Sequence, residues 1–124
     1  MDYTSHRNYH RGRDISRDYL YELVKPGESV LDVGCGSGWV YENFKEKGID
    51  IHYKGVDFTK NFIEGAKIDF PDAKWEVGSA EDIKELDNSW DVVILYHVLE
   101  LCPSWQKAVD EALRVAKKDR KSVV

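Results

Sequence analysis

The alternation of apolar and polar positions predicts that helices and strands follow one another along the chain. Apolar residues recur at helical spacing over 15–24, and a Pro-Gly pair marks the end of that helix. The apolar run 29–33 (SVLDV) predicts a strand that leads straight into the glycine-rich segment GCGSG. Behind these glycines, the pattern predicts an amphipathic helix from Trp39 up to Gly48. The first part of the chain therefore has the order helix, strand, glycine loop and helix.

The second part of the chain continues this alternation. Its predicted elements are strands over 51–56 and 74–77, a helix over 60–67, a helix from Pro103 to Ala116, and the start of a strand over 121–124. The run 91–96 (DVVILY) has no polar alternation, which is typical of a strand covered on both faces of a parallel sheet, so we expect it at the centre. The pattern as a whole predicts an α/β fold with a parallel sheet, helices on both of its faces, and ligands beyond the carboxyl ends of the strands.

Composition narrows the class of protein. The chain has 124 residues and a formal net charge of −5; this length fits one domain, and the acidic balance argues against nucleic acid as a partner. Its most apolar stretch is under half of the roughly 20 residues that a membrane-spanning helix needs, and the polar N-terminus lacks the apolar centre of a secretory signal. We therefore expect a cytoplasmic protein without a membrane partner. Cys35 and Cys102 match no metal-ligand spacing, so we expect reduced thiols and no metal site.

The segment LDVGCGSG over 31–38 carries the first candidate chemistry. Its three glycines allow a sharp turn and let a ligand approach bare backbone at the start of a helix. A turn needed only for tight packing is the alternative interpretation. The dinucleotide fingerprint GxGxxG would need a glycine at position 39, where Trp39 stands, and this weakens a nicotinamide-binding interpretation.

The pattern D-x-G-x-G-x-G after a first strand resembles the nucleotide-binding motif of class I S-adenosylmethionine-dependent methyltransferases, especially their broad small-molecule group. The resemblance covers about residues 28–116 and rests on four motifs in order. It implies S-adenosylmethionine as cofactor, S-adenosylhomocysteine as product, a small-molecule acceptor, and a Rossmann-like sheet in the strand order 3-2-1-4-5. In this first motif it implies cofactor contacts from Asp32, Gly34, Cys35, Gly36 and Gly38.

The second motif follows the second predicted strand. Asp57 stands 21 positions after Gly36 and matches the family acid that holds the cofactor ribose, with Phe58 beside it as a further cofactor-binding residue. A carboxylate there can accept both hydroxyl protons of a ribose. The alternative for Asp57 is to cap the next helix, in competition with Thr59.

The third motif, VGSAEDI over 77–83, resembles the adenine-binding loop of the family. The resemblance places Ser79, Ala80, Glu81 and Asp82 by the base, although Ser79 stands where an Asp or Asn is frequent. An acidic helix start over 81–86 is the alternative interpretation of the two acids.

The fourth motif, DVVILYHVLEL, resembles the segment that floors the methionine end of the cofactor. Tyr96 is a candidate aromatic wall for the sulfonium, and His97 is the candidate catalytic residue, with positioning or packing as its alternative role. The upstream segment YHRGR over 9–13 resembles a cap that closes over the cofactor in some relatives. We therefore expect one domain over 1–124, with an N-terminal cap and helix over 1–27 and a Rossmann-like core over 28–124.

Relatives continue through further strands that build much of the acceptor pocket, so we expect this chain to be C-terminally short. Two other interpretations remain open: an S-adenosylmethionine-binding module without independent catalysis, and an NAD-type nucleotide-binding oxidoreductase domain. In the expected strand order only residues 121–124 cover the outer side of the fourth strand, which makes this edge a candidate surface for self-association into a homo-oligomer.

Overall fold

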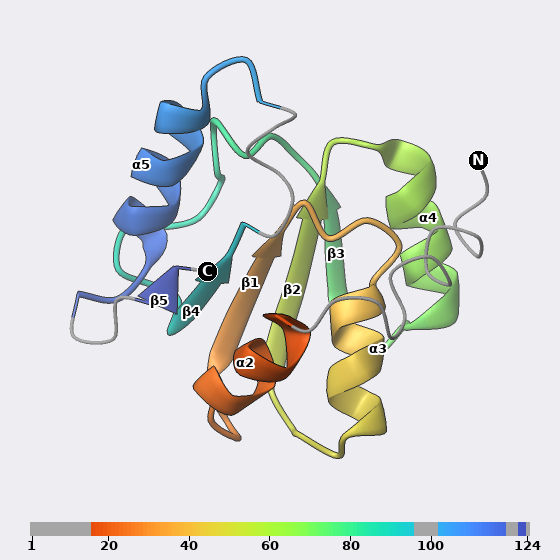
Figure 1. Cartoon of the computed structure of the whole chain (residues 1–124). Coiled ribbons are helices and arrows are strands. Elements are labelled where there is room, and N and C mark those ends of the chain that lie inside the picture. The colour runs from red at the N-terminus through yellow and green to blue at the C-terminus, as the bar shows by residue number, and fades with distance from the viewer. Residues whose placement is uncertain (1–15, 96–101, 119–121, 124) are drawn as a thin grey trace.

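The computed structural model of the chain describes residues 16–95, 102–118 and 122–123. In this part of the chain, parallel strands form one sheet made of β1 (Ser29–Val33), β2 (His52–Asp57), β3 (Lys74–Val77), β4 (Val92–Ile94) and β5 (Ser122–Val123). The strand order is β3-β2-β1-β4-β5 (Figure 1). The predicted Rossmann-like sheet and its strand order are confirmed.

Helices connect the strands. The helix α2 (Ser16–Leu23) precedes β1, α3 (Trp39–Glu46) follows it, α4 (Lys60–Asp69) joins β2 to β3, and α5 (Trp105–Val115) joins β4 to β5. The helix α5 begins after Ser104, whose Oγ accepts a hydrogen bond from the Lys107 N–H at 3.4 Å, and not at Pro103 as predicted.

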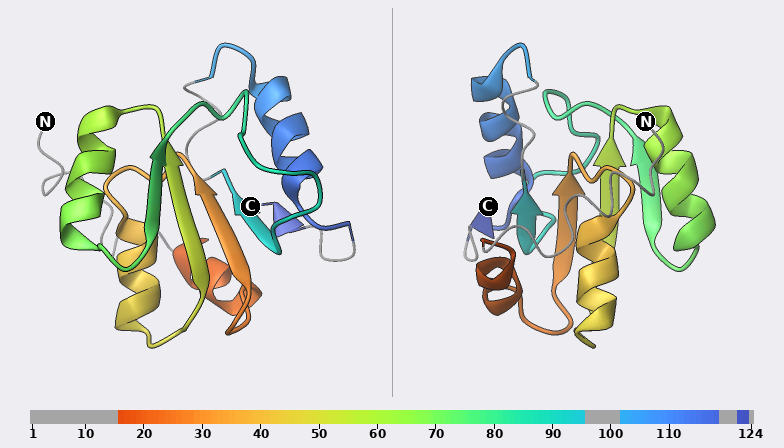
Figure 2. Two further views of the ribbon diagram at one scale, coloured as in Figure 1. Left: turned by 180° about the vertical axis from the view of Figure 1, so that it is seen from behind. Right: turned by 45° about the vertical axis from the view of Figure 1, so that its right-hand side comes forward.

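The helices cover both faces of the sheet. On one face, Val30 of β1 packs in an apolar cluster with residues of α2, α3 and α4, including the fully buried Phe44. On the other face, Leu31 packs with Ala108 and other residues of α5. Successive side chains of a strand point to opposite faces, so β1 contributes to both clusters. Accordingly, α2 and α3 lie in front of the strands in Figure 1 and behind them in the reverse view of Figure 2.

The run 91–96 is a shorter strand than predicted, and it is not the middle one. Its strand β4 covers Val92–Ile94 and is fully buried, which agrees with its continuous apolar sequence. The middle strand is β1, which pairs with β2 on one side and with β4 on the other. The motif-bearing strand therefore lies at the centre of the sheet, with its glycine loop between the neighbouring strands.

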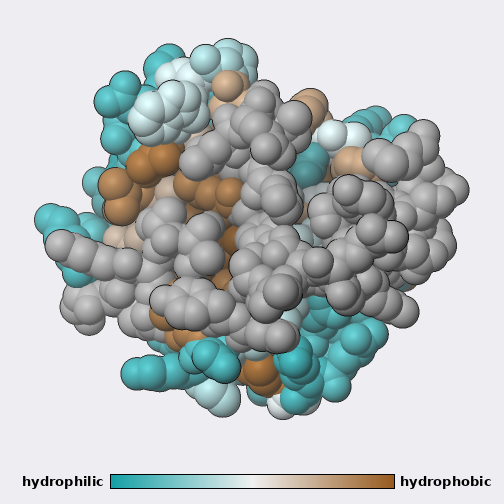
Figure 3. Space-filling model, viewed as in Figure 1, coloured by the Kyte–Doolittle hydropathy of each residue, from teal (hydrophilic) through white to brown (hydrophobic). Residues whose placement is uncertain are grey.

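Some apolar surface is left exposed. The side chains of Trp105 and Leu113 on α5 are 61% and 54% exposed, and Figure 3 shows apolar atoms over the part of the molecule where α5 lies. Among the helices that the structure describes, none is both long enough and apolar enough to cross a membrane.

Candidate functional site

The glycine loop turns sharply between β1 and α3. Gly34, Gly36 and Gly38 have φ angles of 83°, 57° and 96°, in the left-handed region where a side chain is strained. The N–H groups of Gly34 and Cys35 both donate to the Val56 carbonyl oxygen, at 2.7 and 3.1 Å, and this fixes the loop against β2. The loop therefore makes the sharp turn that its three glycines predicted.

Packing explains part of this glycine pattern. A Cβ atom on Gly38 would lie 2.7 Å from a ring carbon of Trp75, so the close approach of that indole requires glycine there. Gly34 has a different surrounding, because it lines a cavity. The tight-packing alternative therefore accounts for Gly38 and does not account for Gly34.

Asp57 joins the glycine loop to the start of α4. Its Oδ2 accepts a hydrogen bond from the Gly36 N–H and its Oδ1 accepts one from the Thr59 N–H, both at 2.8 Å. The side chain is buried, and Thr59 makes no side-chain hydrogen bond as the residue that caps α4. Asp57 thus has a local structural role, and it also borders the same cavity as Gly34.

This cavity opens at the carboxyl ends of β1, β2 and β3 and has a volume of about 400 Å³. Its lining consists of Val33, Gly34, Asp57, Phe58, Gly78, Ser79, Ala80, Glu81, Cys102 and Pro103. The volume lies within the range of about 300–1,000 Å³ that is usual for small-molecule sites. Three of the sequence motifs, far apart along the chain, therefore meet at one hollow.

The Ser79–Asp82 turn forms one wall of this cavity. Ser79 and Asp82 pair as an isolated antiparallel bridge, and the Ser79 Oγ accepts from the Glu81 N–H at 3.1 Å. Residues 81–86 form no helix, so the alternative of an acidic helix start is wrong. Glu81 lines the cavity and its Oε2 accepts from the Ser104 N–H at 3.4 Å.

The two acids of the turn have different surroundings. Asp82 has a 67% exposed side chain that forms an ion pair with Lys84 at 2.6 Å, and it is absent from the lining of the cavity. Of the two candidates for a contact to the base, the structure therefore brings Glu81 to the cavity and leaves Asp82 on the surface.

Asp32 and Cys35 are buried and do not line the cavity. Asp32 is 1% exposed, and its carboxylate accepts a hydrogen bond from the hydroxyl of Tyr53 on the neighbouring strand β2. Burial raises the pKa of Asp32 to about 7, against the opposing effect of the Tyr53 hydrogen bond. Burial also raises the pKa of the Cys35 thiol, which disfavours the thiolate form that acts as a nucleophile.

Several predicted residues lie outside the described part of the chain. They are Tyr96 and His97 after β4, and the N-terminal segment 9–13. Within the described residues, no three His, Cys, Asp or Glu side chains are grouped so that they could hold a metal ion.

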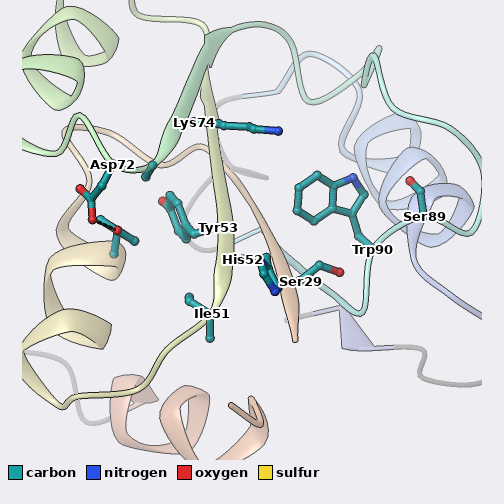
Figure 4. A pocket seen from close by; sticks show the side chains of 10 residues that line it. Ser29, Ile51, His52, Tyr53, Asp72, Lys74, Ser89 and Trp90 are labelled. Atoms are coloured by element: carbon teal, nitrogen blue, oxygen red, sulfur yellow. Dashed lines mark hydrogen bonds between the residues drawn. The ribbon is translucent and has the colours of Figure 1, made fainter. Parts of the chain in front are cut away.

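A second cavity lies at the opposite end of the sheet, where β1, β2 and β3 begin. It has a volume of about 270 Å³ and is lined by residues such as His52, Asp72, Lys74 and Trp90. Figure 4 shows Lys74 extended across β2 toward the side where Trp90 lies. None of the predicted site residues lines this cavity. The motifs therefore mark the cavity at the carboxyl ends of the strands.

Comparison with known proteins identifies the family of the segment that contains the residues of this cavity. Residues 31–124 match the family model described as "Methyltransferase domain". The chain belongs to this methyltransferase family. Its fold is the Rossmann-like fold of the family, whose cofactor is S-adenosylmethionine.

Curated relatives of this methyltransferase domain include enzymes named for different substrates. The chain is 34% identical over 99 residues to a demethylmenaquinone methyltransferase of Renibacterium salmoninarum, a match that covers 80% of this chain and 41% of the relative. It is also 34% identical over 101 residues to an arsenite methyltransferase of Halobacterium salinarum, covering 77% of this chain and 26% of the relative. The chain thus matches less than half the length of these relatives.

Solved structures share the fold of the methyltransferase domain. A TehB-like SAM-dependent methyltransferase from Corynebacterium glutamicum superposes with a TM-score of 0.70 at 26% identity. That match covers 94% of this chain and 65% of the other.

The sequence did not indicate every residue that forms the cavity of the methyltransferase domain. Cys102 and Pro103 close one side of it, although they stand 45 and 46 positions after Asp57. Pro103 carried only the signal of a helix start, and Cys102 carried none. The wall they form depends on where α5 packs, which is a tertiary property.

Proposed function

We propose that the protein is an S-adenosylmethionine-dependent methyltransferase that methylates a nucleophilic atom of a small-molecule acceptor and releases S-adenosylhomocysteine. The observation that carries this proposal is the meeting of Gly34, Asp57 and the Ser79–Glu81 wall at one cavity. These are the residues that the family resemblance assigns to the cofactor. The names of the relatives, which refer to demethylmenaquinone and arsenite, support an acceptor of small size.

Each wall of the cavity offers a different kind of contact to the cofactor. Gly34 exposes backbone without a side chain, and the Asp57 carboxylate offers lone pairs for ribose hydroxyls. Phe58 is 68% exposed on the cavity lining and offers an aromatic face to the base. Ser79, Ala80 and Glu81 offer backbone groups and one carboxylate to the polar edge of the adenine.

The other motif residues support these contacts from a distance. Gly36 and Gly38 shape the loop, Cys35 is a buried residue within it, and Asp32 accepts a hydrogen bond from Tyr53 of the next strand. We propose that these four residues act on the loops that hold the cofactor and not on the cofactor itself, and that the exposed Asp82, which pairs with Lys84, takes no part in binding.

The cofactor supplies an activated methyl group on a sulfonium, and the protein contributes alignment and exclusion of water. Tyr96 is proposed as an aromatic wall near the sulfonium, because a cation is attracted to the face of a ring. His97 is proposed as the residue that positions the acceptor or takes its proton. The segment 9–13 is proposed to cap the site.

Calorimetric titration of the whole chain tests the cofactor assignment. Binding of S-adenosylhomocysteine, with no binding of NAD, supports the proposal, and the reverse preference supports the oxidoreductase alternative. A methyl-release assay over a panel of small acceptors then separates an enzyme from a binding module. Binding without turnover on any acceptor favours the module.

Two further properties are proposed with this function. Cys35 is a buried cysteine that forms no disulfide, which agrees with action in the cytoplasm. Self-association through the outer edge of the sheet is the second property, and it is supported by the few pairs that β5 makes with β4 among the described residues, at Val92 and Val93. Sedimentation of the chain over a range of concentrations measures this association, and a monomer at every concentration rejects it.

A further inference from the structure

The Ser79–Glu81 wall, to which the proposed function assigns the adenine base, belongs to the long connection between β3 and β4. This connection, residues 78–91, contains no helix and no strand beyond isolated bridges. A segment without regular structure must be held by contacts to other elements if it is to keep one shape. Those contacts decide how well the Ser79–Glu81 wall is preorganised.

The helix α5 holds this connection at Ile83, immediately after the Ser79–Asp82 turn. The Ile83 N–H donates to Glu111 Oε1 at 3.0 Å, and the Ile83 carbonyl oxygen accepts from Arg114 Nη2 at 2.8 Å. The Ile83 side chain is 4% exposed and packs in the apolar cluster that contains α5. Both backbone polar groups of one residue are thus bound by two side chains of the same helix.

Arg114 uses its whole guanidinium in this contact. Nε donates to Glu111 at 2.7 Å, and Nη2 donates to Glu111 at 3.1 Å as well as to Ile83. Nη1 donates to the Glu85 carbonyl oxygen at 3.0 Å and to Asp87 at 2.7 Å. The five N–H groups of the planar fork therefore all have partners, a pattern that a lysine cannot reproduce.

The pair also connects the two sides of the cavity. Glu111 and Arg114 lie on the helix whose leading segment supplies Cys102 and Pro103 to the lining. Their bonds to Ile83 and Glu85 fix the opposite wall to that helix. A change at this pair alters the separation of the two walls without touching either of them.

We infer that Glu111 and Arg114 are positioning residues that hold the Ser79–Glu81 wall in the shape that recognises the adenine base. The inference rests on the proposed function of the cavity. Arg114→Met removes the hydrogen bonds to the Ile83 and Glu85 carbonyl oxygens, so the wall loses its support although no lining residue is substituted. The variant is then expected to lose binding affinity through its contacts to the adenine base more than through its contacts to the rest of the cofactor.

Two ligands that differ only at the base test this inference on the whole chain. They are S-adenosylhomocysteine and S-inosylhomocysteine, in which an oxygen replaces the exocyclic amine. In Arg114→Met and Arg114→Lys, affinity for the adenine ligand is expected to fall about tenfold and the ratio of the two affinities to fall with it. Lys107→Met is the matched control, because it removes a positive charge from an exposed position of the same helix and should keep the wild-type ratio.

The readout separates positioning from general stability. Circular dichroism and the unfolding midpoint identify a temperature at which each variant is folded, and binding is measured there. If Arg114→Met does not fold, Glu111→Gln is measured in its place. This variant lacks the carboxylate charge that orients the Arg114 guanidinium. An unchanged ratio, or an equal loss for both ligands, overturns the inference and leaves the proposed function standing. No binding of either ligand by the wild-type chain overturns both.

Discussion

At the scale of single residues, Asp57 has a structural role besides the binding role proposed for it. One carboxylate oxygen accepts from the Gly36 N–H and the other from the Thr59 N–H. A carboxylate oxygen has a second lone-pair site, so ribose hydroxyls can be accepted without release of the two loops. The proposed ribose contact would therefore couple the position of the cofactor to the geometry of the glycine loop through this one side chain.

Asp57→Ala is expected to weaken the binding of S-adenosylhomocysteine about ten- to a hundredfold. The reason is that hydrogen bonds to a charged group are worth about 1.5–3 kcal/mol. Asp82→Ala is the matched control, because its carboxylate is exposed and paired with Lys84 away from the cavity. Calorimetric titration of both variants measures the difference. An equal loss in the two variants would contradict the ribose assignment.

Asp32 gives the folded state a specific pH dependence. Burial raises its pKa from 3.8 to about 7, so between these pH values the folded chain binds a proton that the unfolded chain has released. The free energy of unfolding contributed by Asp32 therefore falls as the pH rises from about 4 to about 7. The fall is on the order of 4 kcal/mol for an isolated group.

Asp32→Asn should remove this contribution, because an amide does not titrate and its oxygen can still accept from Tyr53. Urea unfolding of both proteins at pH 5 and pH 8 measures the effect. The wild type is expected to lose more stability than the variant between the two pH values, since other carboxyl groups titrate equally in both. Parallel curves would show that the Asp32 pKa is close to its ordinary value.

At the scale of elements, the sequence predicted the strands whose bounds depend on residues close by in the chain. The bounds of β1 and β3 were predicted to the residue, and each of these short strands is followed directly by a glycine, Gly34 and Gly78. The connection 78–91 was not predictable in the same way. Its acids permitted a helix start, and its actual shape depends on distant partners such as Arg114, and Lys54, which pairs with Glu85 at 2.6 Å. The Ser79–Glu81 wall of the candidate site belongs to this connection, so its shape could not be predicted from the sequence either.

The start of α3 depends on Gly38 for two reasons that can be separated. Gly38 has a φ of 96° and a Cβ there would lie 2.7 Å from the Trp75 ring, whereas Gly48 has a φ of 71° and open space around it. Gly48→Ala should cost about 1 kcal/mol of stability from backbone strain alone. Gly38→Ala should cost about 2–4 kcal/mol, because overpacking adds to that strain. Denaturant unfolding compares them, and equal losses would mean that the indole moves aside freely.

At the scale of the whole molecule, the topology explains why residues far apart in sequence form one site. In a parallel sheet with the order β3-β2-β1-β4-β5, the carboxyl ends of β1, β2 and β3 lie next to one another. The motif order along the chain was therefore sufficient to predict that Gly34, Asp57 and Ser79 meet. The contribution of Cys102 and Pro103 was not predictable, because it depends on how α5 packs across the sheet.

Hydrogen exchange of the whole chain tests this convergence directly. S-adenosylhomocysteine is expected to slow exchange together at Gly36, Thr59, Glu81 and Ser104, whose N–H groups are bonded around the cavity by Asp57, Ser79 and Glu81. The reason is that a ligand bound between these segments suppresses their local opening.

The second cavity supplies the internal control for that experiment. Ser89 and Trp90 line it, and their N–H groups donate to the Val115 carbonyl oxygen at 2.8 and 3.0 Å. Their exchange should change less than that of the four reporters, since only global stabilisation reaches them. Protection confined to Ser89 and Trp90 would move the cofactor to the amino ends of the strands and overturn the assignment of Asp57. Protection at Gly36 and Thr59 without Ser104 would keep the ribose contact and remove α5 from the site.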